Sequence, residues 1–178
     1  MLFEPVARPL VIAHALLGGT LVALTTHHLV WIVRSRGSRR RGEPRFALLA
    51  SGAFFLTFLF GCVVYPTYRV RVRAEYFDAS VAHDAERALQ KSHALAPGPA
   101  LQAVGLERAA RIFDVKEHLV ALGLFASAAL FWLSRRADPS DPDDRPLYVG
   151  LATFVCATSW SGVVVGLYTA SLRSVGGS

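Results

Sequence analysis

The sequence predicts an all-α integral membrane protein, a four-transmembrane-helix bundle with a helical extramembrane insertion between the second and third helices. The chain of 178 residues is 53% hydrophobic and only 18% charged, and its apolar residues gather in four long runs. At about 1.5 Å per helical residue, such runs can cross a hydrocarbon core of ~30 Å. We therefore expect one membrane domain over 1–178, with spans at about 10–33, 46–66, 112–134 and 147–172 and an extramembrane helical hairpin at about 67–111.

The first span, 10–33, contains no Asp, Glu, Lys or Arg but carries His14, His27 and His28. His14 and His28 return to nearly the same helix face, because each residue turns the helix by about 100°. Gly18 lies on that face between them. This face is the first indication of a functional site within a span.

Basic residues in the short loops predict the orientation of the chain. The segment 34–45 holds six arginines and one glutamate, and Arg135, Arg136 and Arg145 flank the second short loop. Short arginine-rich loops stay in the cytoplasm, so both termini and the segment 67–111 are expected outside, although YRVRVR at 68–73 is also basic. The net charge of +6 therefore belongs to these loops and does not indicate nucleic-acid binding. We expect a multi-pass protein of a bacterial-type inner (plasma) membrane.

The third span is too short in its apolar part. Residues 119–133 reach only about 22 Å, so the helix must draw residues 113–118 into the membrane. These include Asp114, Lys116 and His118. Polar residues at that depth are costly, and they pair with one another, face the bundle interior or serve function.

His14 and His118 are predicted to lie at the same depth, about four residues inside the outer boundary. Two levelled histidines on different helices are what axial ligation of a haem iron requires. We therefore predict haem b as cofactor, with His14 and His118 as its metal ligands. Four further residues are expected to support it: Gly18 by leaving room for the macrocycle, Arg69 and Arg73 by pairing with the propionates, and Asp114 by accepting the proton of the non-ligating nitrogen of His118.

The other histidines have simpler interpretations. The spacing of His14 and His28 is similar to that on helices of dihaem cytochrome b proteins, in which one helix supplies a ligand to each of two haems. Here the resemblance covers one helix, and no second pair is available within the chain. His27 and His28 are therefore expected to hydrogen-bond locally, together with Thr25 and Thr26. His83 and His93 in the hairpin have no metal-ligand spacing.

The fourth span carries small residues at every fourth position. Thr158, Gly162, Gly166 and Ala170 form a stripe that lets two helix backbones approach closely. We predict a homo-oligomer, or a subunit of a membrane complex, that uses Gly162 and Gly166. Aromatic residues Trp31, Trp132 and Tyr148 are expected near one membrane interface, which fits either orientation of the chain.

Taken together, these patterns predict a small b-type haem protein or electron-transfer subunit with one bis-histidine haem near the outer face, and a quinone or a periplasmic redox partner. The alternative is a non-catalytic structural or assembly subunit without a cofactor. Structural polar packing of the histidines, or a proton or metal site, also remains open. The sequence holds no motif for nucleophilic catalysis. It leaves open whether the protein is an enzyme.

Overall fold

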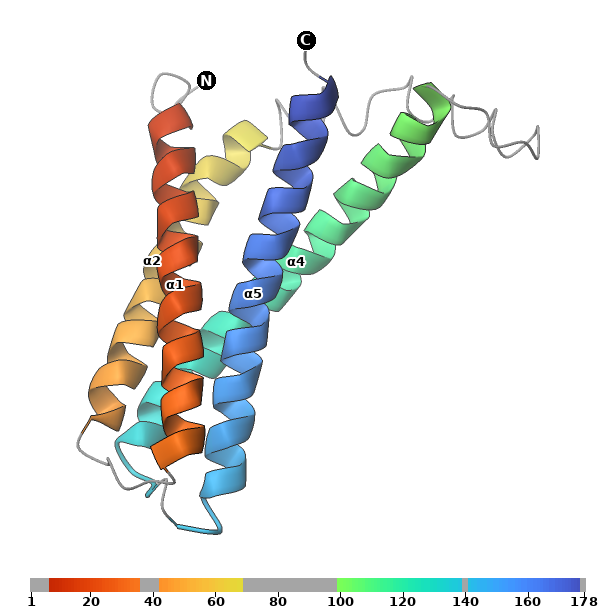
Figure 1. The fold of residues 1–178 in the computed structure, drawn as a ribbon. Helices are drawn as coiled ribbons and strands as arrows, with labels where there is room; N and C mark the ends of the chain where they lie inside the picture. Colours follow the sequence, from red (N-terminus) through yellow and green to blue (C-terminus); the bar gives the residue numbers. More distant parts are fainter. Residues whose placement is uncertain (1–6, 36–41, 69–98, 139–140, 177–178) are drawn as a thin grey trace.

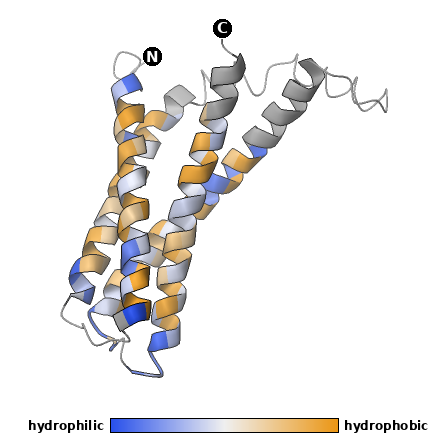
Figure 2. Cartoon of the chain, in the orientation of Figure 1, coloured by the Kyte–Doolittle hydropathy of each residue, from blue (hydrophilic) through white to orange (hydrophobic). Residues whose placement is uncertain are grey.

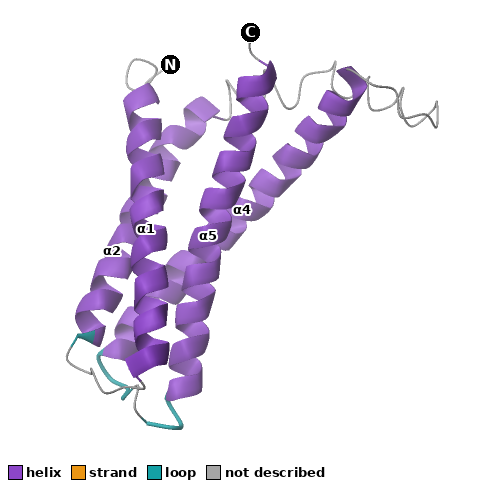
Figure 3. Ribbon diagram, in the orientation of Figure 1, coloured by secondary structure: helices purple, strands orange, loops and turns teal. Residues whose placement is uncertain are grey.

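The computed structural model describes residues 7–35, 42–68, 99–138 and 141–176, and each regular element in these ranges is an α-helix (Figure 3). The helices are α1 (Ala7–Ser35), α2 (Glu43–Tyr68), α4 (Pro99–Ser134) and α5 (Arg145–Gly176). Helix α1 begins and α5 ends at the same end of the bundle, here called the terminal end (Figure 1). At the opposite end, the loop end, α1 is followed by α2 and α4 by α5.

All four helices are long and apolar enough to cross a membrane, which confirms the all-helical prediction and the number of candidate spans (Figure 2). These spans are Arg8–Arg34, Glu43–Tyr65, Arg111–Ser134 and Arg145–Ala170. Helix α4 continues on the terminal side of its span as far as Pro99. Residues 69–98, which hold most of the predicted hairpin, lie outside the described residues.

Helix α2 begins earlier than the sequence predicts. Glu43 and Arg45, placed in a loop by their charge, form the first turn of α2, where Phe46 N donates to Gly42 O at 3.1 Å. Pro44 suits a first turn because its missing N–H would have no helical partner there. The Glu43 carboxylate also lies at the positive end of the helix dipole. These local effects favour a helix although the segment is rich in arginine. Helix α2 therefore begins about one turn earlier than predicted.

The helices form a ring in which each packs on two neighbours: α1 on α2, α2 on α4, α4 on α5, and α5 on α1. Helices α1 and α4, which carry His14 and His118, are therefore diagonal to each other. Toward the terminal end, α4 leans away from the other helices (Figure 1).

The bundle presents apolar side chains outward and encloses many polar ones. Phe125 is 73% exposed, Leu16 68% and Leu167 67%. Among the described residues, the buried polar or charged ones are Thr25, His28, Glu43, Thr57, Ser127, Ser134, Thr158, Ser159 and Thr169. An outer surface this apolar is suited to lipid, while a polar interior is unusual for a core that only needs to exclude water.

Three helices approach one another closely at Gly123 of α4. A Cβ atom built there would lie 2.5 Å from Thr158 Oγ1 of α5 and 2.6 Å from Phe54 Cζ of α2. Only a glycine lets these three helices approach so closely. Leu130 and Val155, both 1% exposed, continue the apolar core toward the loop end.

Candidate functional site

Two close contacts show which residues of different helices share a level in the terminal half. A Cβ atom on Gly18 of α1 would lie 3.5 Å from Val163 Cγ2 of α5. A Cβ atom on Gly162 of α5 would lie 3.5 Å from Val120 Cγ2 of α4. Position 18 of α1, positions 162 and 163 of α5 and position 120 of α4 are therefore level. One helical turn nearer the terminal end, each of these helices reaches a residue that matters for the site: His14, Gly166 and Lys116.

His14 lies with its ring against α2. A Cβ atom on Gly61 would lie 3.2 Å from His14 Cε1, so the glycine provides the space that the imidazole fills. The backbone of Thr57, one turn before Gly61 in α2, lies near the ring. The ring nitrogen Nδ1 is buried and has no hydrogen-bond partner among the described residues. A neutral imidazole that donates its one N–H to a backbone carbonyl keeps a free lone pair on the other nitrogen.

Lys116 extends between α4 and α5. Its Nζ lies 3.7 Å from the position that a Cβ atom on Gly166 would take, and 4.8 Å from the centroid of the Phe113 ring. The charge of Lys116 interacts with His14 across the bundle and with Glu117, its neighbour in sequence. A half-buried ammonium group therefore lies between α4 and α5 at the level of His14.

We call His14, Gly61, Lys116 and Gly166 the terminal layer, because each of the four helices contributes one of them. The two glycines add no side chain, so an imidazole and an ammonium group are the side chains that this layer supplies. A free lone pair beside a cation suits a ligand that has a metal or a hydrogen-bond donor at one point and an anionic group at another.

The structure brings Lys116, and not His118, toward His14. His118 is exposed, and its Nδ1 lies 2.8 Å from the backbone oxygen of Asp114 in the same helix. Residues two apart on a helix point about 200° away from each other, so a helix that turns Lys116 inward turns His118 outward. Asp114 was predicted to accept the proton of the non-ligating nitrogen of His118, and its contact with the ring is made by its backbone carbonyl.

The remaining predicted site residues divide into two groups. Gly18 is buried, but it packs against Val163 of α5, one turn away from the terminal layer. Arg69 and Arg73 lie outside the described residues. Within the described ranges, no group of three or more His, Cys, Asp or Glu residues could hold a metal ion.

At the loop end, His28 corrects the prediction of local hydrogen bonding. Its Nε2 lies 3.0 Å from Glu43 Oε2 of α2, and the two side chains are only 2% and 1% exposed. Phe46, one turn after Glu43, stacks on the imidazole with the ring centroids 6.1 Å apart. His27 instead faces outward, with its ring centroid 5.2 Å from that of Phe46.

Tyr148 completes this loop-end cluster of His28, Glu43, Ser134 and Tyr148. Its side chain lies inside the bundle at the loop end, with 0% exposure. Its hydroxyl oxygen and Glu43 Oε1 are both buried without a hydrogen-bond partner among the described residues. Ser134 Oγ donates to Phe131 O at 2.6 Å and is within reach of the phenol. Each of the four helices thus contributes one residue to this polar cluster.

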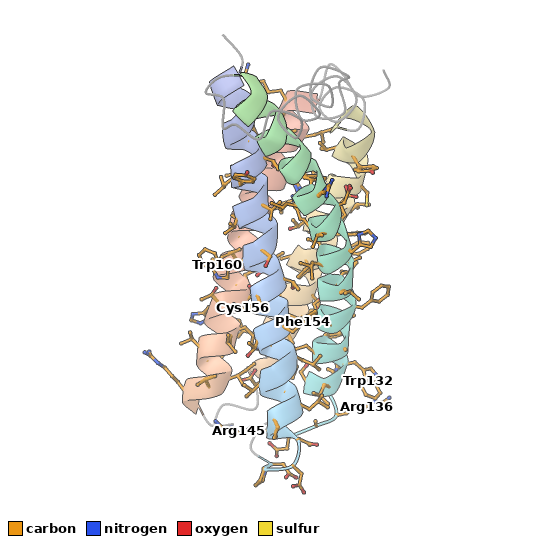
Figure 4. All side chains as sticks on the ribbon, turned by 90° about the vertical axis from the view of Figure 1, so that its right-hand side faces the viewer. Trp132, Arg136, Arg145, Phe154, Cys156 and Trp160 are labelled. Carbon is orange, nitrogen blue, oxygen red and sulfur yellow. The ribbon has the colours of Figure 1, made fainter. Side chains whose placement is uncertain are left out.

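Thr25 and Thr26 make contacts between helices as well as local ones. Thr25 Oγ1 bonds to Leu21 O at 2.9 Å and also lies 2.8 Å from Ser159 Oγ of α5. Thr26 Oγ1 accepts a hydrogen bond from Trp160 Nε1 at 3.0 Å, and Trp160 lies on the outer side of α5 (Figure 4). These contacts join α1 to α5 between the terminal layer and the loop-end cluster.

Sequence reasoning missed Gly61, Gly166 and Lys116 as parts of one site, and Glu43 as the partner of His28. One signal was present: Lys116 and His118 cannot both face the interior, since they are two residues apart on one helix. For Glu43 there was no such signal, because its partner lies on another helix.

The chain matches no protein-family model, no curated protein and no solved structure.

Proposed function

We propose that this chain is a small b-type haem protein or electron-transfer subunit of a bacterial-type inner membrane, and that His14 is a ligand of the haem. The observation that supports this proposal is the buried His14 Nδ1, which has no partner among the described residues. In the loop-end cluster, by contrast, Nε2 of His28 is engaged by Glu43.

The surroundings of His14 suit an axial ligand. Histidines that bind metals hold their other N–H on a carbonyl or carboxylate, which fixes the ring and its tautomer. The Thr57 backbone is near enough for that role. Gly61 has no side chain, so it leaves space for the His14 ring. Haem b, when bound, would supply the one-electron redox chemistry. The part of the chain would be to hold the ring, exclude water and balance the charge.

The second axial ligand is the less supported part of the proposal. His118 was predicted from its depth, and the Asp114 carbonyl at its Nδ1 leaves Nε2 as the nitrogen that could bind a metal. However, α4 would have to turn about its own axis to direct this nitrogen toward His14. His118 therefore stays a prediction, to be tested separately from His14.

The position of the terminal layer bears on the partner. If both termini lie outside, as the arginine-rich loops predict, a haem at His14 is near the outer face of the membrane. Electron exchange with a quinone or with a periplasmic redox protein would then be possible without crossing the whole bilayer. The chain is proposed to work as a homo-oligomer or within a membrane complex.

The test is the absorption spectrum of detergent-purified protein reconstituted with haem. We expect a Soret band shifted from that of free haem, lost in His14→Ala and kept in His27→Ala, which removes an outward-facing histidine of the same helix. A folded protein whose haem spectrum does not change would contradict the proposal and favour the cofactor-free assembly subunit. His118→Ala addresses only the second ligand: loss of the low-spin spectrum would assign it to His118, and an unchanged spectrum would exclude it.

A further inference from the structure

Two ionisable side chains of the loop-end cluster are buried as a pair. His28 of α1 and Glu43 of α2 are only 2% and 1% exposed, and His28 Nε2 lies 3.0 Å from Glu43 Oε2. Each residue belongs to a candidate membrane span. A net charge in such a place is costly, because burial removes its solvation by water. The number of protons on the pair therefore decides whether this part of the bundle is neutral.

The described arginines near the cluster do not supply the counter-charge. They are exposed or half-buried at the loop ends of all four helices: Arg34, Arg45, Arg135, Arg136 and Arg145. Arg135 and Arg136 lie over the rings of Phe131 and Trp132. On the α5 side, the Asp144 carboxylate accepts a hydrogen bond from Asp138 N at 3.1 Å. Among the described residues, the ion-pair partner of Glu43 is His28.

The charge of the pair is set by simple proton counting. A carboxylate and a neutral imidazole together carry one negative charge. One added proton makes the pair neutral, either as imidazolium and carboxylate or as imidazole and carboxylic acid. A second added proton would leave one positive charge. Burial therefore favours the form that holds one proton.

The other polar atoms of the cluster fit this form. Glu43 Oε1 and the Tyr148 hydroxyl oxygen are buried without a hydrogen-bond partner among the described residues, and Tyr148 lies near both Glu43 and Ser134. Ser134 Oγ donates to Phe131 O at 2.6 Å, so its lone pairs can accept. The phenol can accept from a protonated Oε1 while it donates to Ser134, or it can donate to an ionised Oε1. A small side-chain rotation thus satisfies both atoms in either one-proton form.

We propose that the loop-end cluster is a proton-binding site, in which His28 and Glu43 share one proton at a pH where exposed histidine and glutamate side chains hold none. The proton is taken from water at the loop end, which is the nearer surface of the bundle. This site does not depend on haem and lies at the opposite end of the bundle from the terminal layer.

The first test uses the unmodified full-length protein in detergent. At about pH 8, exposed carboxyl groups are ionised and exposed imidazoles are neutral. We expect either the infrared C=O band of a protonated carboxyl group or the nitrogen NMR signal of an imidazolium. Glu43→Gln should remove the signal, because an amide cannot hold the proton and His28 is then neutral. Asp143→Asn, the same acid-to-amide change in the exposed loop before α5, should keep it.

The second test measures the folding equilibrium in mixed micelles from about pH 7 to 9, where the unfolded chain carries no proton on these two side chains. The folded protein then binds one proton more than the unfolded chain. Its folding equilibrium constant should therefore fall by up to about tenfold for each pH unit, relative to Glu43→Gln. Asp143→Asn should keep the pH dependence of the unmodified protein, since the other titrating groups are the same.

The outcomes decide the proposal even if Glu43→Gln does not fold. Absence of both spectroscopic signals from the unmodified protein would overturn it without any variant. A signal, or an unchanged pH dependence, that survives in Glu43→Gln would assign the proton to another residue and would also contradict it.

Discussion

Glu43 is an acidic residue that is almost completely buried, and the hydrogen-bond partner of its side chain among the described residues is an imidazole. The Glu43 and His28 side chains are 1% and 2% exposed, with 3.0 Å between Oε2 and Nε2. Replacing such a pair with apolar residues can be harmless, but removing one partner leaves the other buried and uncompensated. The interaction can therefore be tested by comparing the stability of the single variants with that of the double variant.

We expect Glu43→Ala to lower the free energy of unfolding by about 3 kcal/mol, because His28 would lose its partner inside the bundle. The double variant His28→Ala/Glu43→Ala should lose less than the sum of the two single variants, by ~1 kcal/mol or more. Reversible unfolding in mixed detergent micelles measures all of these. Asp143→Ala, in the exposed loop before α5, is the control and should unfold like the unmodified protein. Strict additivity would mean that the two side chains do not interact.

Position 123 requires a glycine because side chains of two other helices lie too close for a Cβ atom. Gly123→Ala should lower the free energy of unfolding by roughly 1–3 kcal/mol, because the new methyl group would meet Thr158 Oγ1 and Phe54 Cζ at 2.5 and 2.6 Å. Gly52→Ala is the matched control in a neighbouring helix, since nothing lies within 4 Å of its Cβ position. There the substitution should be neutral or gain about 0.5–1 kcal/mol from helix propensity. Equal effects at both positions would contradict the close helix approach.

At the scale of elements, the small-residue stripe on α5 has a use within the chain. The Cβ positions of Gly162 and Gly166 are 3.5 and 3.7 Å from side chains of α4, at Val120 and Lys116. The two glycines therefore help α4 and α5 to pack against each other. Their predicted contact with a second protein remains a prediction, which the same substitutions can test.

We expect Gly166→Leu to lower the melting temperature, because the leucine would displace Lys116 and separate α5 from α4. Native mass spectrometry should find the oligomeric state unchanged. Gly150→Leu, on α5 with nothing within 4 Å of its Cβ position, is the control for adding the same bulk. Dissociation of an oligomer by Gly166→Leu without a change in monomer stability would instead support the partner surface predicted from the stripe.

At the scale of the whole molecule, polar groups lie inside and apolar groups outside along much of the bundle. The terminal layer and the loop-end cluster are separated by apolar core residues such as Phe54 and Leu130, both 1% exposed. At the loop end, Trp132 and Arg136 lie at the end of α4 and Arg145 at the start of α5 (Figure 4). Basic and aromatic residues at one end of a bundle are typical of a membrane interface.

The orientation of the whole chain can be tested with two engineered cysteines. Ser38→Cys lies in the arginine-rich segment and Ser92→Cys in the long segment between α2 and α4. We expect a membrane-impermeant maleimide to label position 92 in intact cells and position 38 only after the cells are opened, because short basic loops stay in the cytoplasm. The unmodified protein, with Cys62 and Cys156 in its spans, gives the background. The reverse labelling pattern would invert the proposed topology and move His14 to the cytoplasmic side.

The sequence by itself determined the four helices and their approximate limits. The length of an apolar run is a local property, so 10–33 and 46–66 could be assigned without knowing any neighbour. It also identified His14 and the unusual polar start of the third span. Only the tertiary structure decided which face of each helix points inward and which partner each polar group finds. Lys116 faces the interior in place of His118, and His28 meets Glu43, because the rotation of a helix about its axis is set by packing against helices distant in sequence. The roles of the glycines at 61, 123 and 166 also became visible only in the tertiary structure, because a side chain of another helix uses the space that each one provides.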